Sequence, residues 1–153
     1  MFIFVSASRQ ISRQRTTNSK MTTTRPTLFD PLRKKRVAYT PEEVVRQGFI
    51  QWLVKERNYP LQLMMSEYTI SYNSRNFRCD IVCFTRDLKP LMVVECKAPE
   101  VKIDNSVIEQ VTRYNMVLKV KFVVITNGVV TFALALDEES GKYKFIEDIP
   151  QYN

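Results

Sequence analysis

Residues 77–84 read Phe-Arg-Cys-Asp-Ile-Val-Cys-Phe, and residues 91–97 read Leu-Met-Val-Val-Glu-Cys-Lys. Both runs are short, rich in apolar residues and bounded by polar residues or proline, so both are predicted to be strands. Side chains alternate between the two faces of a strand. Glu95 and Lys97 are therefore expected on one face of the second strand and Cys96 on the other.

Asp80 is the carboxylate of the first strand, where it is expected to share a face with Val82 and Phe84. If Asp80 and Glu95 lie about 4 Å apart on neighbouring strands, they repel by roughly 4 kcal/mol at an effective dielectric near 20. The single ammonium of Lys97 offsets only part of this cost. A divalent cation would satisfy both carboxylates, and hard oxygen ligands suit Mg²⁺. The pattern predicts a metal site with an ammonium beside it.

Asp80, followed fifteen residues later by Glu95-Cys96-Lys97, resembles the signature of the PD-(D/E)xK nuclease superfamily. That signature is an acidic residue followed by (D/E)-x-K at the end of the next strand. One departure is that Cys79 stands where the motif usually has proline, a position that varies in the superfamily.

Further along, Gln110 and Tyr114 match the Q-x-x-x-Y element of one branch. The whole run 95–118 resembles the N-terminal nuclease domain of type I restriction enzyme R subunits, and the likeness covers roughly residues 39–149. It implies an α/β fold with a restriction-endonuclease-like mixed β-sheet. The expected αβββαβ core is flanked by helices and carries a C-terminal β-hairpin extension.

The resemblance also implies a Mg²⁺-dependent deoxyribonuclease, expected to be an endonuclease of the restriction type, with Mn²⁺ as a substitute metal. Asp80 and Glu95 would hold the metal, with the backbone carbonyl of Cys96 as a further ligand. Lys97 would orient the attacking water or stabilise developing negative charge. Sequence specificity, endo- versus exonuclease action, DNA versus RNA, the number of metals and the oligomeric state, including a homodimer, stay open.

The first helix is predicted to begin at Thr40, with Pro41 at its first position and Glu43 at its third. Its apolar stripe consists of Val45, Phe49, Trp52 and Leu53. The resemblance implies that an acidic residue of this helix approaches the metal, and Glu43 matches best by position. The alternative is that Glu43 only completes the capping box.

The second helix is predicted to be capped by Asp104 or by a box that begins at Ser106. Its buried stripe is expected to contain Val107, Val111, Tyr114 and Leu118. Gln110 and Tyr114 are four residues apart, so both can point toward the carboxylates. The residues alone favour Tyr114 as core and Gln110 as a boundary residue. With the resemblance, Gln110 would hold the Lys97 amine or the scissile phosphate, and Tyr114 would support it.

The strand order is predicted from the turns. Residues 61–72, 77–84 and 91–97 should form an antiparallel meander, and a helix should then cross over to a strand at 121–126. This crossover makes the sheet mixed. Asn127-Gly128 predicts a type I′ turn into a strand at 129–136, and residues 143–146 predict a short edge strand.

The composition excludes several classes of protein. The 153 residues contain no histidine, which removes His-based triads, His-containing zinc sites and His general bases. Apolar residues make up 44% of the chain, enough for a core, and no apolar run approaches the length of a membrane span. Three cysteines in strand patterns suggest a reducing, cytoplasmic location. Cys79 and Cys83, expected on the face opposite Asp80, are predicted to be core residues rather than zinc ligands.

The net charge of +7 is concentrated near the N-terminus. Residues 1–36 hold nine Lys or Arg residues and one acid, whereas the remainder is nearly neutral. We therefore predict a basic, disordered leader over residues 1–36, with Met21 as a candidate start, and a nuclease-like domain over residues 37–153. The leader, including the basic cluster at 33–36, is either a phosphate-binding arm or a solvated tail.

Three functions remain to be distinguished. The first is a metal-dependent nuclease acting on DNA. The second is a non-catalytic or partner-dependent nucleic-acid-binding module of the same fold, working with a motor or specificity subunit. The third is a structural partner in which Asp80, Glu95 and Lys97 form a salt-bridged sheet.

Overall fold

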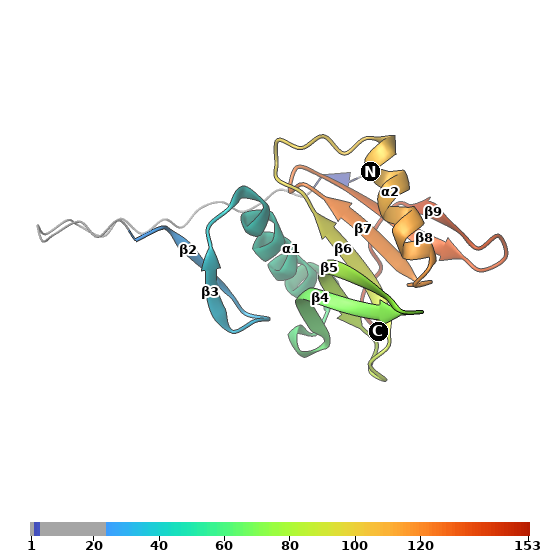
Figure 1. Ribbon diagram of the computed structural model, residues 1–153, viewed down its shortest axis with the longest axis horizontal. Coiled ribbons are helices and arrows are strands. Elements are labelled where there is room, and N and C mark those ends of the chain that lie inside the picture. The colour runs from blue at the N-terminus through green and yellow to red at the C-terminus, as the bar shows by residue number, and fades with distance from the viewer. Residues whose placement is uncertain (1, 4–23) are drawn as a thin grey trace, which may run out of the picture.

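The computed structural model describes residues 2–3 and 24–153, and a mixed sheet of seven strands forms its centre (Figure 1). The strand order is β1-β8-β7-β6-β5-β4, and β9 also pairs with β8. Among the described strands of this sheet, β6 and β7 pair in parallel and all other neighbours are antiparallel. The strands are β1 (Phe2–Ile3), β4 (Met64–Tyr72), β5 (Arg75–Phe84), β6 (Pro90–Cys96), β7 (Phe122–Thr126), β8 (Val130–Asp137) and β9 (Lys142–Ile146).

This topology confirms the predicted α/β class. The meander β4-β5-β6, the crossover to β7 and the extension by β8 and β9 give the αβββαβ core with its C-terminal hairpin. A parallel neighbour requires a crossover connection, and the second helix supplies it between β6 and β7.

Helix α1 (Pro41–Arg57) begins where the sequence predicts. The Thr40 hydroxyl accepts a 3.1 Å hydrogen bond from the backbone N–H of Glu43. The helix ends at Asn58, which is left-handed with φ 58°. Its predicted stripe faces the sheet: Val45, Phe49 and Leu53 are buried, and Trp52 is partly buried.

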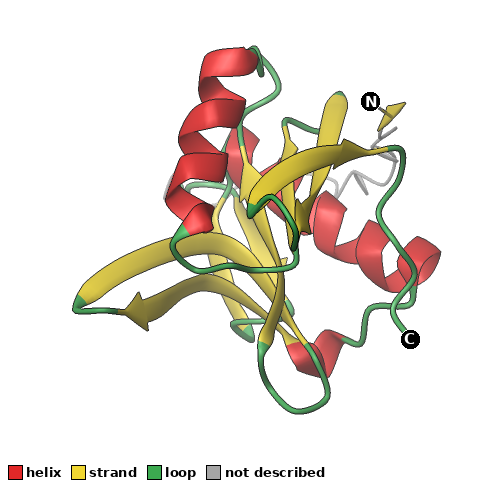
Figure 2. Cartoon of the chain, turned by 90° about the vertical axis from the view of Figure 1, so that its right-hand side faces the viewer, coloured by secondary structure: helices red, strands yellow, loops and turns green. Residues whose placement is uncertain are grey.

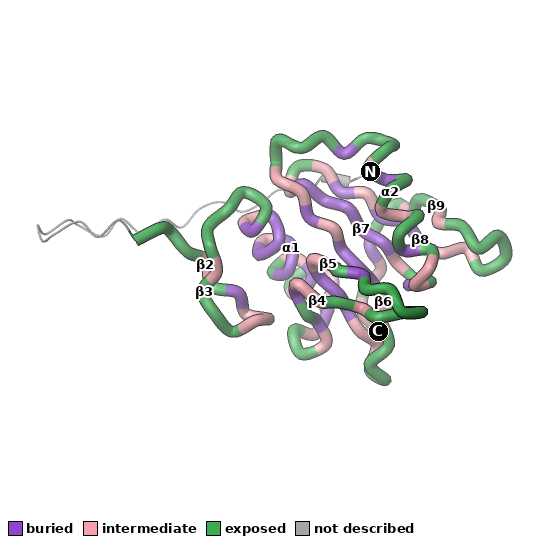
Figure 3. Tube along the Cα trace, viewed as in Figure 1, coloured by how far each residue is buried: buried purple, intermediate pink, exposed green. Residues whose placement is uncertain are grey.

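Helix α2 (Asn105–Met116) is capped by Asp104, whose carboxylate accepts hydrogen bonds from the backbone N–H groups of Ser106 and Val107 at 3.0 and 3.2 Å. The two helices lie on opposite sides of the sheet (Figure 2). The buried residues lie mainly along α1 and the central strands (Figure 3), and they form core clusters on both sides of the sheet. No helix among the described residues has the length and hydropathy to cross a bilayer.

The prediction of a disordered leader over residues 1–36 is wrong for its last part. Strands β2 (Thr27–Asp30) and β3 (Lys35–Ala38) form an antiparallel hairpin beside α1 (Figure 1). The hairpin is held by Asp30, which is fully buried and accepts hydrogen bonds from Ser66 of β4 at 2.7 Å and from the backbone of Leu32 at 2.8 Å. At the other end of the predicted leader, β1 pairs with β8. Residues 1 and 4–23 of the leader, including Met21, lie outside the described residues.

Strand β4 changes faces in its middle. Met64 packs in the layer of α1, whereas Tyr68 and Ile70 pack in the layer of α2. Strict alternation would place all three on one face. The change occurs at Glu67, whose backbone is left-handed with φ 52°.

Strand β5 changes faces at the position opposite Glu67, which is Asp80. Cys79 packs in the α2 layer, but Ile81 and Cys83 pack in the α1 layer. The predicted shared face of Asp80 with Val82 is therefore wrong, and so is the shared face of Cys79 and Cys83. A regular strand pattern cannot anticipate this paired inversion, because it depends on the backbone of a residue in the neighbouring strand.

Two smaller expectations also change. Residues Leu61–Leu63 form a 3-10 turn, so the strand predicted from residue 61 begins at Met64. The turn after β7 occurs where predicted, but only Gly128 of the Asn127-Gly128 pair has positive φ, at 81°, so it is not of type I′. The Asn127 carboxamide instead accepts hydrogen bonds from the backbone of the next residues of the turn.

Candidate functional site

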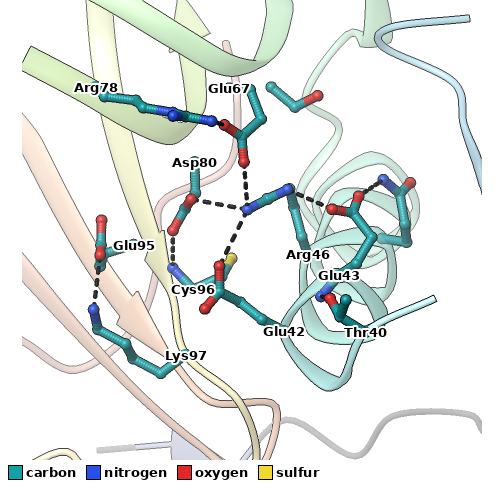
Figure 4. A network of polar contacts seen from close by, with 12 residues as sticks. Thr40, Glu42, Glu43, Arg46, Glu67, Arg78, Asp80, Glu95, Cys96 and Lys97 are labelled. Carbon is teal, nitrogen blue, oxygen red and sulfur yellow. Dashed lines mark hydrogen bonds and ion pairs between the residues drawn. The ribbon is translucent and has the colours of Figure 1, made fainter. Parts of the chain in front are cut away.

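The candidate site lies where β5 and β6 separate. Regular pairing of these strands reaches Ile81 opposite Val94. Beyond that point, the backbone N–H of Cys96 donates a 2.7 Å hydrogen bond to Oδ2 of Asp80 (Figure 4). The Asp80 carboxylate thus accepts the hydrogen bond that a backbone carbonyl of β5 would accept in a regular pair of strands. The predicted placement of Asp80 and Glu95 on adjacent strands is confirmed.

Glu95 and Lys97 share a face, as alternation predicts. The Lys97 ammonium lies 2.9 Å from Oε1 of Glu95, and each side chain is 31% exposed. Both line a cavity of about 500 Å³ beneath α2, and Gln110 and Tyr114 line it as well. The structure therefore brings four of the predicted site residues around one solvent-accessible space.

The electrostatics of this pair are not balanced. Burial raises the pKa of Glu95 and the charge of Asp80 raises it further, and together these outweigh the hydrogen bond from Lys97. Burial lowers the pKa of Lys97, but the hydrogen bond and the charge of Glu95 outweigh it, so the pKa of Lys97 is raised. Lys97 stays protonated, while the carboxylates beside it hold more negative charge than one ammonium offsets.

Arg46 of α1 is the residue that the sequence analysis missed. It is 3% exposed, and its guanidinium lies at the centre of the polar network in Figure 4. Nη1 contacts Glu43 at 2.5 Å, and Nη2 contacts Asp80 at 2.9 Å. Nη2 also contacts Glu67 at 2.8 Å and Glu42 at 3.4 Å.

Arg46 is a fixed positive charge. Burial lowers its pKa, but the charges of Asp80, Glu43 and Glu67 outweigh burial and raise the pKa above its ordinary value. A signal for it exists in the sequence, because Arg46 precedes buried Ile50 by four residues on the same helical stripe. A charge on an apolar stripe indicates a buried, paired group.

Glu43 contributes to the same network from α1. Its backbone N–H donates to the capping hydroxyl of Thr40, but its carboxylate accepts hydrogen bonds from Arg33, Arg46 and Gln47 instead of completing the capping box. Arg33 also pairs with Asp30, so it connects the β2-β3 hairpin to the helix. Glu43 therefore lies among basic partners, and the described contacts do not direct it toward Glu95.

Tyr114 does not occupy the buried stripe predicted for α2. It is 42% exposed, and its ring packs edge-on against Phe77 with centroids 4.5 Å apart. Its hydroxyl accepts a 3.2 Å hydrogen bond from the backbone N–H of Arg78 and donates to the carbonyl of Asn76 at 3.3 Å. Tyr114 thereby docks α2 onto β5, and this contact keeps Gln110 above the cavity. The ammonium of Lys97 contacts Glu95 rather than Gln110.

The donor set fits a single hard cation. No group of three or more His, Cys, Asp or Glu side chains in the described part of the chain is arranged to hold a metal. Mg²⁺ commonly binds proteins through one or two carboxylates and keeps several waters. Asp80 and Glu95 supply two such groups, and a divalent cation would offset both the burial and the charge of Asp80 that raise the pKa of Glu95. The residues present therefore fit Mg²⁺ or Mn²⁺.

Comparisons with known proteins agree with the fold. The chain is similar to a solved fragment described as the HsdR subunit of a type I restriction enzyme from Vibrio vulnificus YJ016, with a TM-score of 0.50 and 22% identity. The alignment covers 72% of this chain and 23% of that one, so this chain spans less than a quarter of the solved relative. At this identity the likeness shows the fold alone. No curated protein matches the chain.

A family model gives the stronger result. The model for the type I restriction enzyme R protein N terminus (HSDR_N) matches residues 41–150. That match begins at the first residue of α1 and includes α2 and the strands β4 to β9. The chain therefore belongs to the family of type I restriction enzyme R protein N-terminal domains.

Proposed function

We propose that this chain is a metal-dependent nuclease domain that hydrolyses DNA phosphodiester bonds, with endonuclease action. The observation that carries the proposal is the Glu95-Lys97 ion pair in the cavity beneath α2, with Asp80 held beside it by the backbone of Cys96. This arrangement offers anionic ligands and a cationic donor within reach of the same substrate atom.

Asp80, Glu95 and the carbonyl of Cys96 would hold Mg²⁺ or Mn²⁺. When bound, such an ion supplies an activated water and charge neutralisation at the phosphate. The ammonium of Lys97, protonated because Glu95 raises its pKa, would donate to the phosphate oxygens as their negative charge grows. The Gln110 carboxamide would bind the phosphate from the side of α2, and Tyr114 would position that helix.

The DNA duplex would be held in part by the β2-β3 hairpin. Lys34, Lys35 and Arg36 are exposed on it, and the hairpin is bonded to α1 through Arg33 and Glu43. Residues 37–153 are nearly neutral, so the positive charge of residues 1–36, these three cations included, is the main source of attraction for phosphate. This favours the phosphate-binding interpretation of the basic cluster over the solvated tail.

The decisive experiment compares cleavage of supercoiled and single-stranded DNA by the wild-type chain and by Lys97→Ala, with Mg²⁺ or Mn²⁺. We expect Lys97→Ala to lose at least about 100-fold in cleavage rate while it still binds the metal. Lys142→Ala, the same change on the distant strand β9, is the matched control and should cleave normally. Equal cleavage by wild type and Lys97→Ala would refute the assignment.

A second candidate is a binding module that cleaves only with a partner. The similar chain from Vibrio vulnificus YJ016 is described as a subunit of a type I restriction enzyme, and this chain aligns with 23% of it. Under this alternative, a motor or specificity subunit would complete the enzyme. Metal binding and DNA retention without cleavage by the isolated chain would favour it.

A further inference from the structure

The contacts of Arg46 resemble those of a bound cation. Its Nη2 atom lies 2.8 to 3.4 Å from oxygens of three carboxylates, which come from α1, β4 and β5. Meanwhile Nε of the same guanidinium is buried without a hydrogen-bond partner among the described residues. The surrounding carboxylates therefore hold the Arg46 side chain in place by charge, although one of its N–H donors makes no hydrogen bond within the described part of the chain.

The carboxylate of Asp80 is divided between two directions. Oδ1 faces Arg46, and Oδ2 faces the backbone of Cys96 at the end of β6, next to Glu95. A metal between Asp80 and Glu95 leaves Arg46 undisturbed. A second metal on the side of Glu67 and Glu42 would have to displace the guanidinium, which cannot lose its charge in a protein.

We infer that Arg46 is a built-in second cation, so that the site takes one divalent ion per chain and Arg46 fills the position that a second ion would need. Glu67 serves this guanidinium and not the metal. Arg46 is accordingly a positioning residue, which holds Oδ1 of Asp80 through charge. Oδ2 accepts one hydrogen bond from Cys96 and keeps a second lone pair for the metal. The inference rests on the proposed metal-dependent function.

The test counts bound ions. Metal-free wild-type chain is titrated with Mn²⁺, and the free ion is measured by electron paramagnetic resonance. One ion per chain is expected for the wild type and two for Arg46→Gln, whose folding is checked by circular dichroism. Arg78→Gln is the matched control, because Arg78 also pairs with Glu67 but is 75% exposed, and it should keep one ion.

A second variant covers the case in which Arg46→Gln does not fold. Glu67→Gln removes one carboxylate from the guanidinium, and it should bind one Mn²⁺ with a Kd within threefold of the wild type. A tenfold weaker Kd would make Glu67 a metal ligand and overturn the inference. Two ions on the wild type, or one ion on folded Arg46→Gln, would also overturn it. No ion on the folded wild type would overturn both the inference and the proposed metal-dependent function.

Discussion

The hydroxyl of Ser66 on β4 donates a 2.7 Å hydrogen bond to the carboxylate of Asp30, which is completely buried between the β2-β3 hairpin and the sheet. The backbone of Leu32 and the side chain of Arg33 donate to the same carboxylate. A stretch of basic and polar sequence is thereby attached to the folded body at one buried point.

Replacing this anchor should destabilise the protein. We expect Asp30→Asn to lower the free energy of unfolding by about 2 to 3 kcal/mol, because hydrogen bonds to a charged, buried acceptor are lost. Urea unfolding at pH 7 measures the loss. Asp87→Asn, in an exposed turn, should change it little, and an equal effect of both substitutions would contradict the anchoring role of Asp30.

The same anchor predicts a dependence on pH. Burial raises the pKa of Asp30, but the hydrogen bonds from Arg33 and Ser66 outweigh it, so the pKa lies below 3.8 in the folded protein. The stabilisation is thus fully present above the unfolded pKa of about 3.9 and is lost as the pH falls through the folded value. The difference in stability between wild type and Asp30→Asn should therefore stay constant from pH 7 to 5 and shrink below about pH 4.

DNA retention should depend on the hairpin lysines. We expect Lys34→Asn with Lys35→Gln to weaken duplex binding and to reduce the slope of log K against log salt by about 1 to 2, since each phosphate contact contributes about 0.9. Asparagine suits the left-handed backbone of Lys34, which has φ 52°. Fluorescence anisotropy without divalent metal separates this effect from cleavage.

The matched control for the hairpin is Lys119→Asn with Lys142→Gln. Lys119 has the same left-handed backbone, with φ 51°, and both lysines are exposed. This variant loses the same charge in a different part of the molecule. Equal salt slopes for the two double variants would show that only net charge matters.

Tyr114 should contribute to stability in two separable parts. Tyr114→Phe removes the hydroxyl contacts to β5 and should cost about 1 kcal/mol. Tyr114→Ala also removes the ring from Phe77 and should cost about 2 kcal/mol. Tyr39→Phe, at an exposed position before α1, is the control in the same urea experiment. A cost below that of the control would argue against the docking of α2 through Tyr114.

A side chain at Gly128, in the turn after β7, should destabilise the protein. This residue has φ 81°, and an added Cβ would lie 3.1 Å from Cγ2 of Val45 on α1. Gly128→Ala should therefore lower the free energy of unfolding by more than the cost of about 1 to 2 kcal/mol expected for a left-handed alanine alone. Gly141→Ala is the matched control, because φ is 65° but nothing lies within 4 Å. Equal melting temperatures for the two variants would contradict the contact with Val45.

The parts of the fold that depend on local pattern could be predicted from the sequence. Strand alternation placed Glu95 and Lys97 together, and the residues around Thr40 identified the start of α1. The pairing of β5 with β6 followed from short turns between apolar runs. In each case the deciding interactions join residues close in sequence.

What could not be predicted depends on distant partners. The hairpin is ordered by Asp30 and Ser66, which are 36 residues apart, and Arg46 meets Asp80 across 34 residues. The direction of the Asp80 side chain depends on the face change opposite Glu67. The alternation pattern of one strand cannot predict this change, because the backbones of two neighbouring strands must deviate together.

The paired face change of β4 and β5 has an electrostatic consequence. A regular sheet separates the side chains of its two faces, because each side chain packs in one layer only. At Glu67 and Asp80 this separation is interrupted. The Asp80 carboxylate is held from the α1 side by Arg46, and its charge acts on Glu95 in the cavity on the α2 side. The hairpin reaches the same point through Arg33 and Glu43. Ion pairs thus connect the hairpin and α1 to a carboxylate beside the cavity, across a sheet that would otherwise separate them.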